Sequence, residues 1–240
     1  MMKESGACRT KDASKMYTDG TYFDNNKTWH VEDSPWKAKQ IQAIIEKNNI
    51  PITSICEVGC GAGEILKQLS QTIPRVCFTG YELSPQAFEL CQSREDEKVK
   101  FYLKNILDEN VFFDLLLCID VFEHVEDYFG FLKSLKQKSK YKIFHIPLDL
   151  SVISILRGSL LLDRKSLGHL HYFTRETALE TLKDCGYQVV DSLYTKSFIE
   201  IPVNTWKGKV AKPIYQIMFF LAPHFTVRLL GLSSLIVLAK

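Results

Sequence analysis

The stretch ICEVGCGAGE at residues 55–64 decides the fold of this chain. Its first half is an apolar run typical of a buried strand, and its second half carries Gly59, Gly61 and Gly63. Glycine is favoured where the backbone turns sharply or comes close to a ligand. In a doubly wound α/β sheet, the turn after the first strand borders the crevice where ligands bind. We therefore expect a ligand site at this turn.

Strand-like and helix-like segments alternate on both sides of this turn. Apolar runs predict strands at 52–58, 75–81, 99–103, 112–119, 141–146, 187–193 and 234–238. Helical spacing and capping residues predict helices from 35 to about 47, and at 64–71, 85–92, 128–138 and 175–186. Such alternation is typical of an α/β fold in which a doubly wound, mostly parallel, seven-stranded sheet carries helices on both faces.

The chain reads as a single domain spanning residues 1–240, because no internal repeat or low-complexity linker divides it. Residues 1–34 precede the alternation, and residues 35–147 form the core that contains the glycine turn. The segments 148–172 and 196–230 break the alternation, so we interpret them as insertions.

The composition excludes several classes of protein. With 46% hydrophobic and 24% charged residues, the chain is neither disordered nor a simple coiled coil. The formal net charge of +2 gives no reason to expect a nucleic-acid partner. Seven cysteines, most of them inside apolar runs and without a secretory leader before them, indicate a reducing, cytoplasmic compartment. Cys56 and Cys60 have no second cysteine pair of matching spacing, so we predict no zinc site there.

The segment 214–239 is very apolar, but Pro223, His224 and Arg228 divide it into pieces too short to span a bilayer. We predict a short core helix followed by a buried strand at 235–238. Two further interpretations of this apolar segment stay open. One is a peripheral membrane contact, since several lysines accompany the segment, and the other is an apolar mouth for a substrate.

The spacing Gly-x-Gly-x-Gly differs from the dinucleotide fingerprint Gly-x-Gly-x-x-Gly, since Glu64 stands where the last glycine would fall. A glutamate that opens the following helix also repels a pyrophosphate, which favours the positive end of a helix. The site is therefore suited to a nucleoside without phosphates, and a nicotinamide dehydrogenase is disfavoured.

Five segments together resemble the class I S-adenosylmethionine-dependent methyltransferases, in the small-molecule branch that includes ubiquinone-type and antibiotic-tailoring enzymes. They are EVGCGAG at 57–63, FTGYELS at 78–84, YLKNI at 102–106, CIDVFEHV at 118–125 and HLHYFT at 169–174. The resemblance covers roughly residues 36–193 and implies a Rossmann-like methyltransferase fold with S-adenosyl-L-methionine as cofactor.

The resemblance also implies roles for single residues. Glu82 would hold the ribose hydroxyls, Asn105 and Ile106 would contact the adenine, and Glu57 would position the ammonium end of the cofactor. The full set of cofactor-binding residues that we expect is Glu57, Gly59, Cys60, Gly61, Gly63, Glu82, Leu83, Asn105, Ile106, Asp120 and Val121. Aromatic faces such as Phe122, Tyr17 or Tyr22 could add cation–π contacts to the sulfonium. In this family an N-terminal segment often closes over the cofactor, so residues 1–34, with His30, are interpreted as a lid.

Three histidines are candidate catalytic residues: His124, His169 and His145. His124 either touches a ligand or caps the turn after it. For His169 and His171 we favour structural packing first, contact with the methyl acceptor second and metal ligation third, because no nearby acid or cysteine in the sequence completes a metal site. We therefore predict no metal.

The function that we predict is methyl transfer to a small-molecule acceptor, by O-methylation of a fairly apolar or lipid-linked substrate. The alternatives are a non-catalytic cofactor-binding or interaction protein on the same fold, and an N-methyltransferase of a macromolecule. The insertions at 148–172 and 196–230 would build the acceptor pocket.

Overall fold

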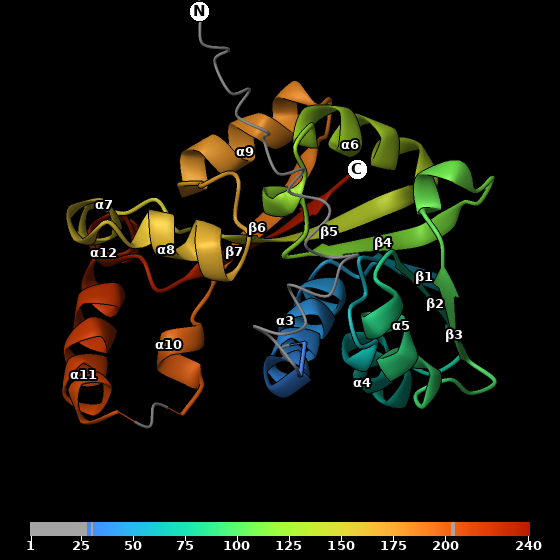
Figure 1. Cartoon of the computed structure of the whole chain (residues 1–240), viewed down its shortest axis with the longest axis horizontal. Helices are drawn as coiled ribbons and strands as arrows, with labels where there is room; N and C mark the ends of the chain where they lie inside the picture. Colours follow the sequence, from blue (N-terminus) through green and yellow to red (C-terminus); the bar gives the residue numbers. More distant parts are fainter. Residues whose placement is uncertain (1–27, 30, 203–204) are drawn as a thin grey trace, which may run out of the picture.

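A single twisted sheet runs through the centre of the computed structural model, which describes residues 28–29, 31–202 and 205–240 (Figure 1). Within these residues the strand order is β3-β2-β1-β4-β5-β7-β6. The strands are β1 (Ser54–Val58), β2 (Cys77–Glu82), β3 (Val99–Leu103), β4 (Phe113–Ile119), β5 (Ser139–Pro147), β6 (Val189–Thr195) and β7 (Ser234–Ala239).

Strands β1 to β5 pair in parallel, whereas β7 lies antiparallel between β5 and β6. The order reverses beside β1, where β2 and β4 flank it on opposite sides. A reversal of this kind leaves a crevice at the carboxyl ends of the strands. The prediction of a doubly wound, mostly parallel sheet is confirmed.

Helices cover both faces of the sheet (Figure 1). On one face lie α3 (Ser34–Lys47), α4 (Glu64–Thr72) and α5 (Pro85–Gln92), and on the other lie α6 (Tyr128–Leu135) and α9 (Arg175–Asp184). Strand β4 is buried on both sides: Leu115 and Leu117 face the first layer, and Leu116 and Cys118 face the second. This explains its continuous apolar sequence.

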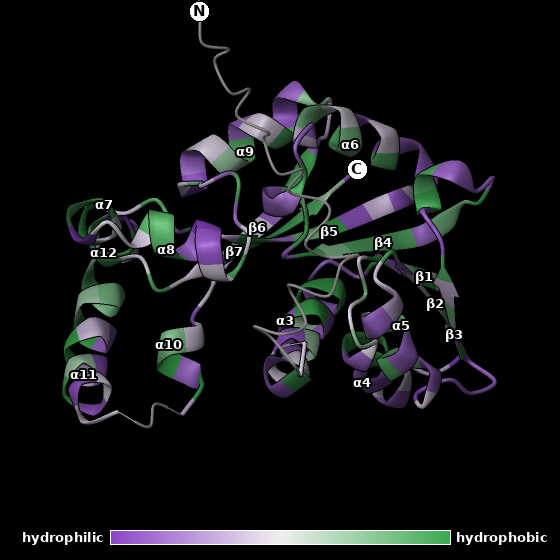
Figure 2. Cartoon of the chain, viewed as in Figure 1, coloured by the Kyte–Doolittle hydropathy of each residue, from purple (hydrophilic) through white to green (hydrophobic). Residues whose placement is uncertain are grey.

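The two segments interpreted as insertions are helical and lie together at one end of the sheet (Figure 1). They contain α7 (Val152–Arg157), α8 (Ser159–Ser166), α10 (Ser197–Glu200), α11 (Trp206–Leu221) and α12 (Pro223–Leu230). Figure 2 shows hydrophobic residues on α7, α8 and α11 as well as on the central strands.

The short core helix predicted before the last strand corresponds to α12, whose Val227 is buried in the core, but the apolar segment also contains a second, longer helix. Pro223 does begin a new helix, but α11 is 16 residues long and Tyr215 is its only buried residue. Ile214, Ile217 and Phe220 are more than half exposed because α11 packs against other inserted helices instead of the sheet. Among the described residues, no helix is both long and apolar enough to cross a membrane.

Candidate functional site

The glycine turn follows β1 and requires glycine for reasons visible in its backbone. Gly59, Gly61 and Gly63 have φ angles of 63°, 55° and 77°, in the left-handed region. A Cβ atom on Gly61 would lie 2.6 Å from Cδ1 of Trp29, and one on Gly63 would lie 2.4 Å from Phe101. The absence of side chains at Gly61 and Gly63 therefore allows the backbone of the turn to lie directly against the rings of Trp29 and Phe101.

Glu82, at the end of β2, holds this turn from within the protein. One carboxylate oxygen accepts a 2.8 Å hydrogen bond from the amide of Gly61, and the other accepts 2.8 Å bonds from the amides of Leu83 and Ser84. Burial raises the pKa of Glu82 above its usual value, although the three amide bonds oppose that shift. Glu82 is thus a structural element of the glycine turn as well as a ligand candidate.

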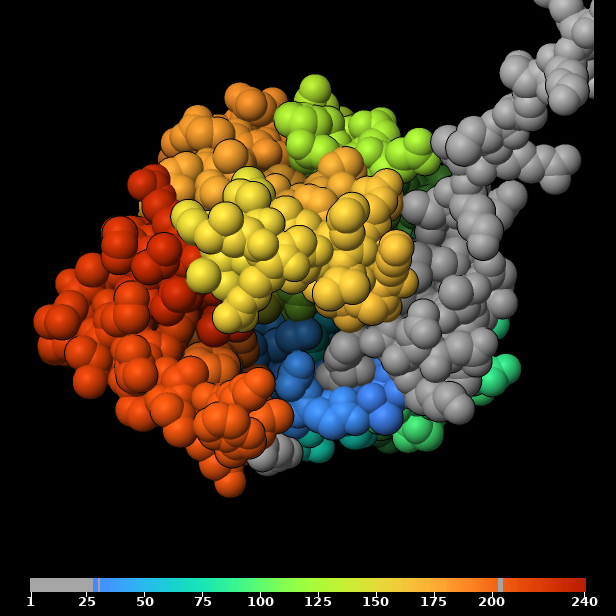
Figure 3. Space-filling model, turned by 60° about the vertical axis from the view of Figure 1, so that its left-hand side comes forward, coloured from blue at the N-terminus to red at the C-terminus, as the bar shows by residue number. Residues whose placement is uncertain are grey.

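A cleft of about 270 Å³ opens beside this turn. Figure 3 shows a hollow between the segment around α7 and α8, the C-terminal helices and α3. Eight of the residues predicted for the site line the cleft: Glu57, Gly59, Cys60, Gly61, Asp120, His124, His145 and His169. All three histidines predicted to be catalytic therefore share one cleft with the glycine turn.

The other predicted residues lie around this cleft and do not line it: Gly63, Glu82, Leu83, Asn105, Ile106 and Val121. Leu83 is 57% exposed, Ile106 is fully buried, and the side chain of Asn105 accepts a 3.0 Å bond from the amide of Leu107. Val121 packs against Gly59. Their assignment to the cofactor stays a prediction.

The prediction that Phe122 offers its face to the cofactor is wrong. Its ring is fully buried and packs against Tyr128, Phe144 and Phe173. Tyr17, Tyr22, Phe23 and His30 lie outside the described residues. Trp29, which the structure does describe, lines the cleft beside Gly61.

Glu57 is a buried carboxyl group at the floor of the cleft, with 1% of its surface exposed. Its Oε2 atom has no hydrogen-bond partner among the described residues. Burial raises the pKa of Glu57 well above its usual value; Lys37 opposes this shift, and Glu82 and Asp120 add to it. A cationic ligand would supply the missing partner.

Asp120 belongs to a buried chain of polar contacts. It follows β4 with a φ of 54°, and its carboxylate contacts Lys37 Nζ at 2.8 Å and His145 Nδ1 at 2.6 Å. The second ring nitrogen of His145 lies 2.9 Å from Oγ1 of Thr195. Burial alone would raise the pKa of Asp120, but His145 and Lys37 outweigh it and hold that pKa far below its usual value. Since both nitrogens of His145 are engaged, this histidine positions Asp120.

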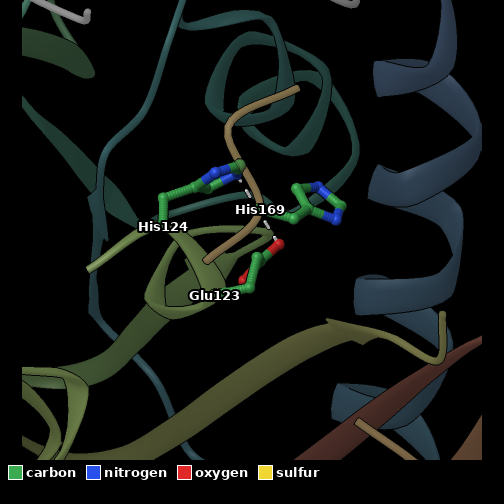
Figure 4. Close-up of side chains that lie close together, drawn as sticks. All are labelled: Glu123, His124 and His169. Atoms are coloured by element: carbon green, nitrogen blue, oxygen red, sulfur yellow. Dashed lines mark ion pairs between the residues drawn. The ribbon is translucent and has the colours of Figure 1, made fainter. Parts of the chain in front are cut away.

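Glu123, His124 and His169 form a cluster, and its two histidines line the cleft (Figure 4). One nitrogen or oxygen atom from each residue lies within 4.8 Å of the others. His169 also places Nδ1 2.6 Å from a carboxylate oxygen of Asp149. Burial and the adjacent His169 lower the pKa of His124 to about 4, and burial with nearby Asp120 raises the pKa of Glu123 well above its usual value. The expectation that no acid lies near His169 is therefore wrong.

Sequence reasoning missed Lys37, Asp149 and Thr195. Lys37 sits in the first turn of α3 with no motif around it, and Thr195 ends a strand of unremarkable sequence. Asp149 carried the best signal, because an acid two residues after β5 falls at the ligand-binding edge of the sheet. His171 was considered beside His169, but its ring contacts Tyr128 and the carbonyl of Val125 instead.

Comparisons with known proteins identify the family of the chain. The profile of a family described as a methyltransferase domain matches residues 29–192. The chain is 28% identical over 125 residues to a ubiquinone biosynthesis O-methyltransferase of Rickettsia typhi, which covers 49% of this chain and 48% of that protein. It is also 28% identical over 124 residues to a phthiotriol/phenolphthiotriol dimycocerosates methyltransferase of Mycobacterium leprae, covering 44% and 45% of the two chains. The chain spans about half the length of the curated relatives it matches.

Among solved structures, the fold resembles magnesium protoporphyrin IX methyltransferase from Synechocystis PCC 6803 with bound SAH. The TM-score is 0.63 at 15% sequence identity, and the alignment covers 94% of this chain and 98% of that one. At this identity the likeness establishes the fold, and the predicted Rossmann-like architecture is confirmed.

Proposed function

The chain belongs to the methyltransferase domain family, and from this premise we propose that it transfers a methyl group from S-adenosylmethionine to a small, fairly apolar acceptor, at oxygen. The observation that carries the proposal is the cleft in which the glycine turn, the unpartnered Oε2 of Glu57 and the two histidines of the cluster meet.

The residues of the cleft fit this cofactor. The buried Oε2 of Glu57 is an acceptor without a partner, which suits an ammonium group. The glycine turn offers backbone at close range, and Glu82 beneath it keeps lone pairs beyond its three amide bonds for ribose hydroxyls. The turn also lacks the features of a pyrophosphate site, since Glu64 opens α4.

A second cavity supports an apolar acceptor. It has a volume of about 640 Å³, lies among the inserted helices α7, α8, α10 and α11, and shares Ser197 and Ser234 with the cleft. Its lining combines apolar side chains such as Ile214 and Leu230 with Arg157 and Asp163. A substrate whose reactive end lies in the cleft could extend an apolar portion into this second cavity.

When bound, S-adenosylmethionine would supply the methyl group as an electrophilic sulfonium: a carbon–oxygen bond would form as the carbon–sulfur bond breaks, the electron pair would stay on sulfur, and the hydroxyl proton would pass to solvent. The chain's own task is mainly to align the acceptor oxygen with the methyl carbon. We assign Glu57 to the ammonium end, and His124 and His169 to the neighbourhood of the acceptor hydroxyl. Lys37 and His145 fix the Asp120 carboxylate at the cleft wall.

The exposed face of α11 suits a contact with an anionic membrane surface. Ile214, Ile217 and Phe220 are 57%, 62% and 86% exposed, and Lys207 and Lys209 lie on the same helix. Flotation with vesicles containing anionic lipid tests this assignment. We expect binding that falls with salt and is lost in the Ile217→Ser/Phe220→Ser double variant; equal flotation of this variant and the parent would overturn it.

The primary experiment is isothermal titration of the full chain with S-adenosylmethionine and its demethylated product. A folded sample that binds neither would sink the proposal. Binding of the cofactor without methyl transfer to any member of a panel of phenols with alkyl tails would favour the non-catalytic alternative. Tight, salt-dependent binding of RNA would favour a macromolecular substrate.

A further inference from the structure

We propose that Glu123, His124 and His169 form a binding site for a divalent first-row transition-metal ion. The three side chains converge from two segments of the chain: Glu123 and His124 from the 3-10 turn after β4, and His169 from the loop before α9 (Figure 4). The Glu123 carboxylate lies 3.8 Å from Nε2 of His124, and the two imidazole centroids are 4.9 Å apart. Ligands that share one ion at about 2.1 Å lie about 3–3.5 Å apart, so small side-chain rotations close the site.

The strongest indication is the Glu123 carboxyl group itself. It is 1% exposed, and neither of its oxygen atoms has a hydrogen-bond partner among the described residues. Burying a polar group without a hydrogen-bond partner is costly, and burying a charged one costs more. A bound cation would provide the missing partner for both oxygens.

The backbone around Glu123 holds the cluster together. Its carbonyl oxygen accepts hydrogen bonds of 2.9 and 3.1 Å from the amides of Leu170 and His171. These bonds fix the loop that carries His169 directly against the turn that carries Glu123. The ligand set is therefore prearranged by main-chain contacts and does not depend on side-chain packing alone.

Asp149 supplies a further feature of metal sites. Its carboxylate lies 2.6 Å from Nδ1 of His169, which leaves Nε2 of the same ring available to an ion. Carboxylate–histidine pairs of this kind orient a metal-bound imidazole and increase its basicity. Asp149 is thus a positioning residue for the site.

The donor set indicates the class of ion. Two imidazole nitrogens and one carboxylate suit zinc, cobalt, manganese or iron, whereas magnesium and calcium favour oxygen ligands throughout. Three protein ligands leave a position open. Because His124 and His169 line the cleft and Asp149 lines the adjoining cavity, that position lies where the two spaces meet. If the proposed function holds, an acceptor oxygen would occupy it, and the ion would lower the pKa of the acceptor hydroxyl.

Cobalt titration tests the site without reference to activity. The full chain, free of any histidine tag and treated with a chelator, is titrated with Co²⁺ and followed by its visible d–d absorption. We expect saturation near one equivalent and loss of the absorption when Zn²⁺ is added. Glu123→Gln and His169→Gln should weaken Co²⁺ binding by more than about 100-fold, and Asp149→Asn by about 10–100-fold.

His171→Gln is the matched control, because His171 lies two residues from His169 and contacts Tyr128 instead of the cluster. Its Co²⁺ affinity should equal that of the parent. Thermal melting and titration with S-adenosylhomocysteine establish that each variant is folded. A folded parent that gives no d–d absorption, or equal Co²⁺ binding by all variants, overturns the site. A parent chain that binds S-adenosylhomocysteine but not Co²⁺ would contradict the metal site alone, and a parent chain that binds Co²⁺ but not S-adenosylhomocysteine would contradict the proposed function alone.

Discussion

The wall of the cleft that carries the glycine turn and the wall that carries His169 differ in how their residues come together. In the first, Glu57, Gly61 and Glu82 lie within 26 positions of sequence, and the amide of Gly61 donates a hydrogen bond to the Glu82 carboxylate. In the second, Glu123, Asp149 and His169 come from separate loops, and Ser197 and Ser234 come from still later segments. The first wall is encoded locally, whereas the second depends on the tertiary fold.

This difference decides how much the sequence could predict. The sequence pattern predicted all seven strands and the glycine turn. Burial on both faces gives a strand a continuous apolar sequence, and left-handed backbone angles favour glycine. The pairing of His169 with Asp149 gives no local sequence pattern, because it depends on how the tertiary fold places two separate loops side by side. Likewise, apolar content in α11 suggested burial, although only Tyr215 is buried in that helix.

The largest expected effect is at Glu82. Glu82→Ala removes the acceptor of three amide groups, and each unsatisfied buried donor costs about 1–3 kcal/mol. We expect a loss of several kcal/mol in the free energy of unfolding and a weakening of S-adenosylhomocysteine binding by more than about 100-fold. Chemical denaturation and calorimetric titration measure the two. Glu89→Ala, at an exposed position of α5, is the control. If both variants changed the free energy of unfolding and the S-adenosylhomocysteine affinity equally, the wall with the glycine turn would not depend on Glu82.

Next comes Asp120, whose carboxylate is held by Lys37 and His145. Asp120→Asn leaves the largely buried Lys37 ammonium without its carboxylate, and the cost approaches the roughly 3–5 kcal/mol of a fully buried pair only as far as solvent does not screen it. The double variant Lys37→Met/Asp120→Asn should recover part of this loss in urea denaturation. A cost of Asp120→Asn below about 1 kcal/mol would show that solvent already screens the pair.

The same carboxylate predicts a pH dependence of stability. The pKa of Asp120 is depressed in the folded protein, so its contribution is complete above its unfolded pKa of about 3.9. It declines as the pH falls toward the folded value. Urea midpoints measured between pH 7 and pH 3 should therefore fall less in Asp120→Asn than in the parent, and parallel profiles would contradict this.

An intermediate effect is expected at the junction of the two cavities. Ser197→Trp should fill the connection at α10 and raise the KM for acceptors with long alkyl tails about tenfold, with cofactor affinity unchanged. Steady-state kinetics over a series of tail lengths provides the measurement. Ser134→Trp, on the exposed face of α6, should leave KM unchanged. If short and long tails lose affinity equally, the second cavity does not hold the tail.

The smallest effect on stability is expected on α11. Ile217→Ser/Phe220→Ser alters two exposed side chains, so the free energy of unfolding should stay within about 0.5 kcal/mol per substitution. Thermal melting checks this value. A large destabilisation would mean that the apolar face of α11 is packed against protein in solution.

The position of β7 has a consequence for the order of folding. It comes last of the seven strands in the chain, yet it lies between β5 and β6, and β6 pairs with no other described strand. Contacts so distant in sequence are slow to form, because a long loop must close first. Until β7 inserts, His145 on β5 cannot meet Thr195 on β6, and the buried chain that fixes Asp120 is incomplete. The cleft is therefore complete only after β7 has inserted between β5 and β6. A partly synthesised or kinetically trapped chain would have a formed glycine turn, while the second wall would be incompletely folded.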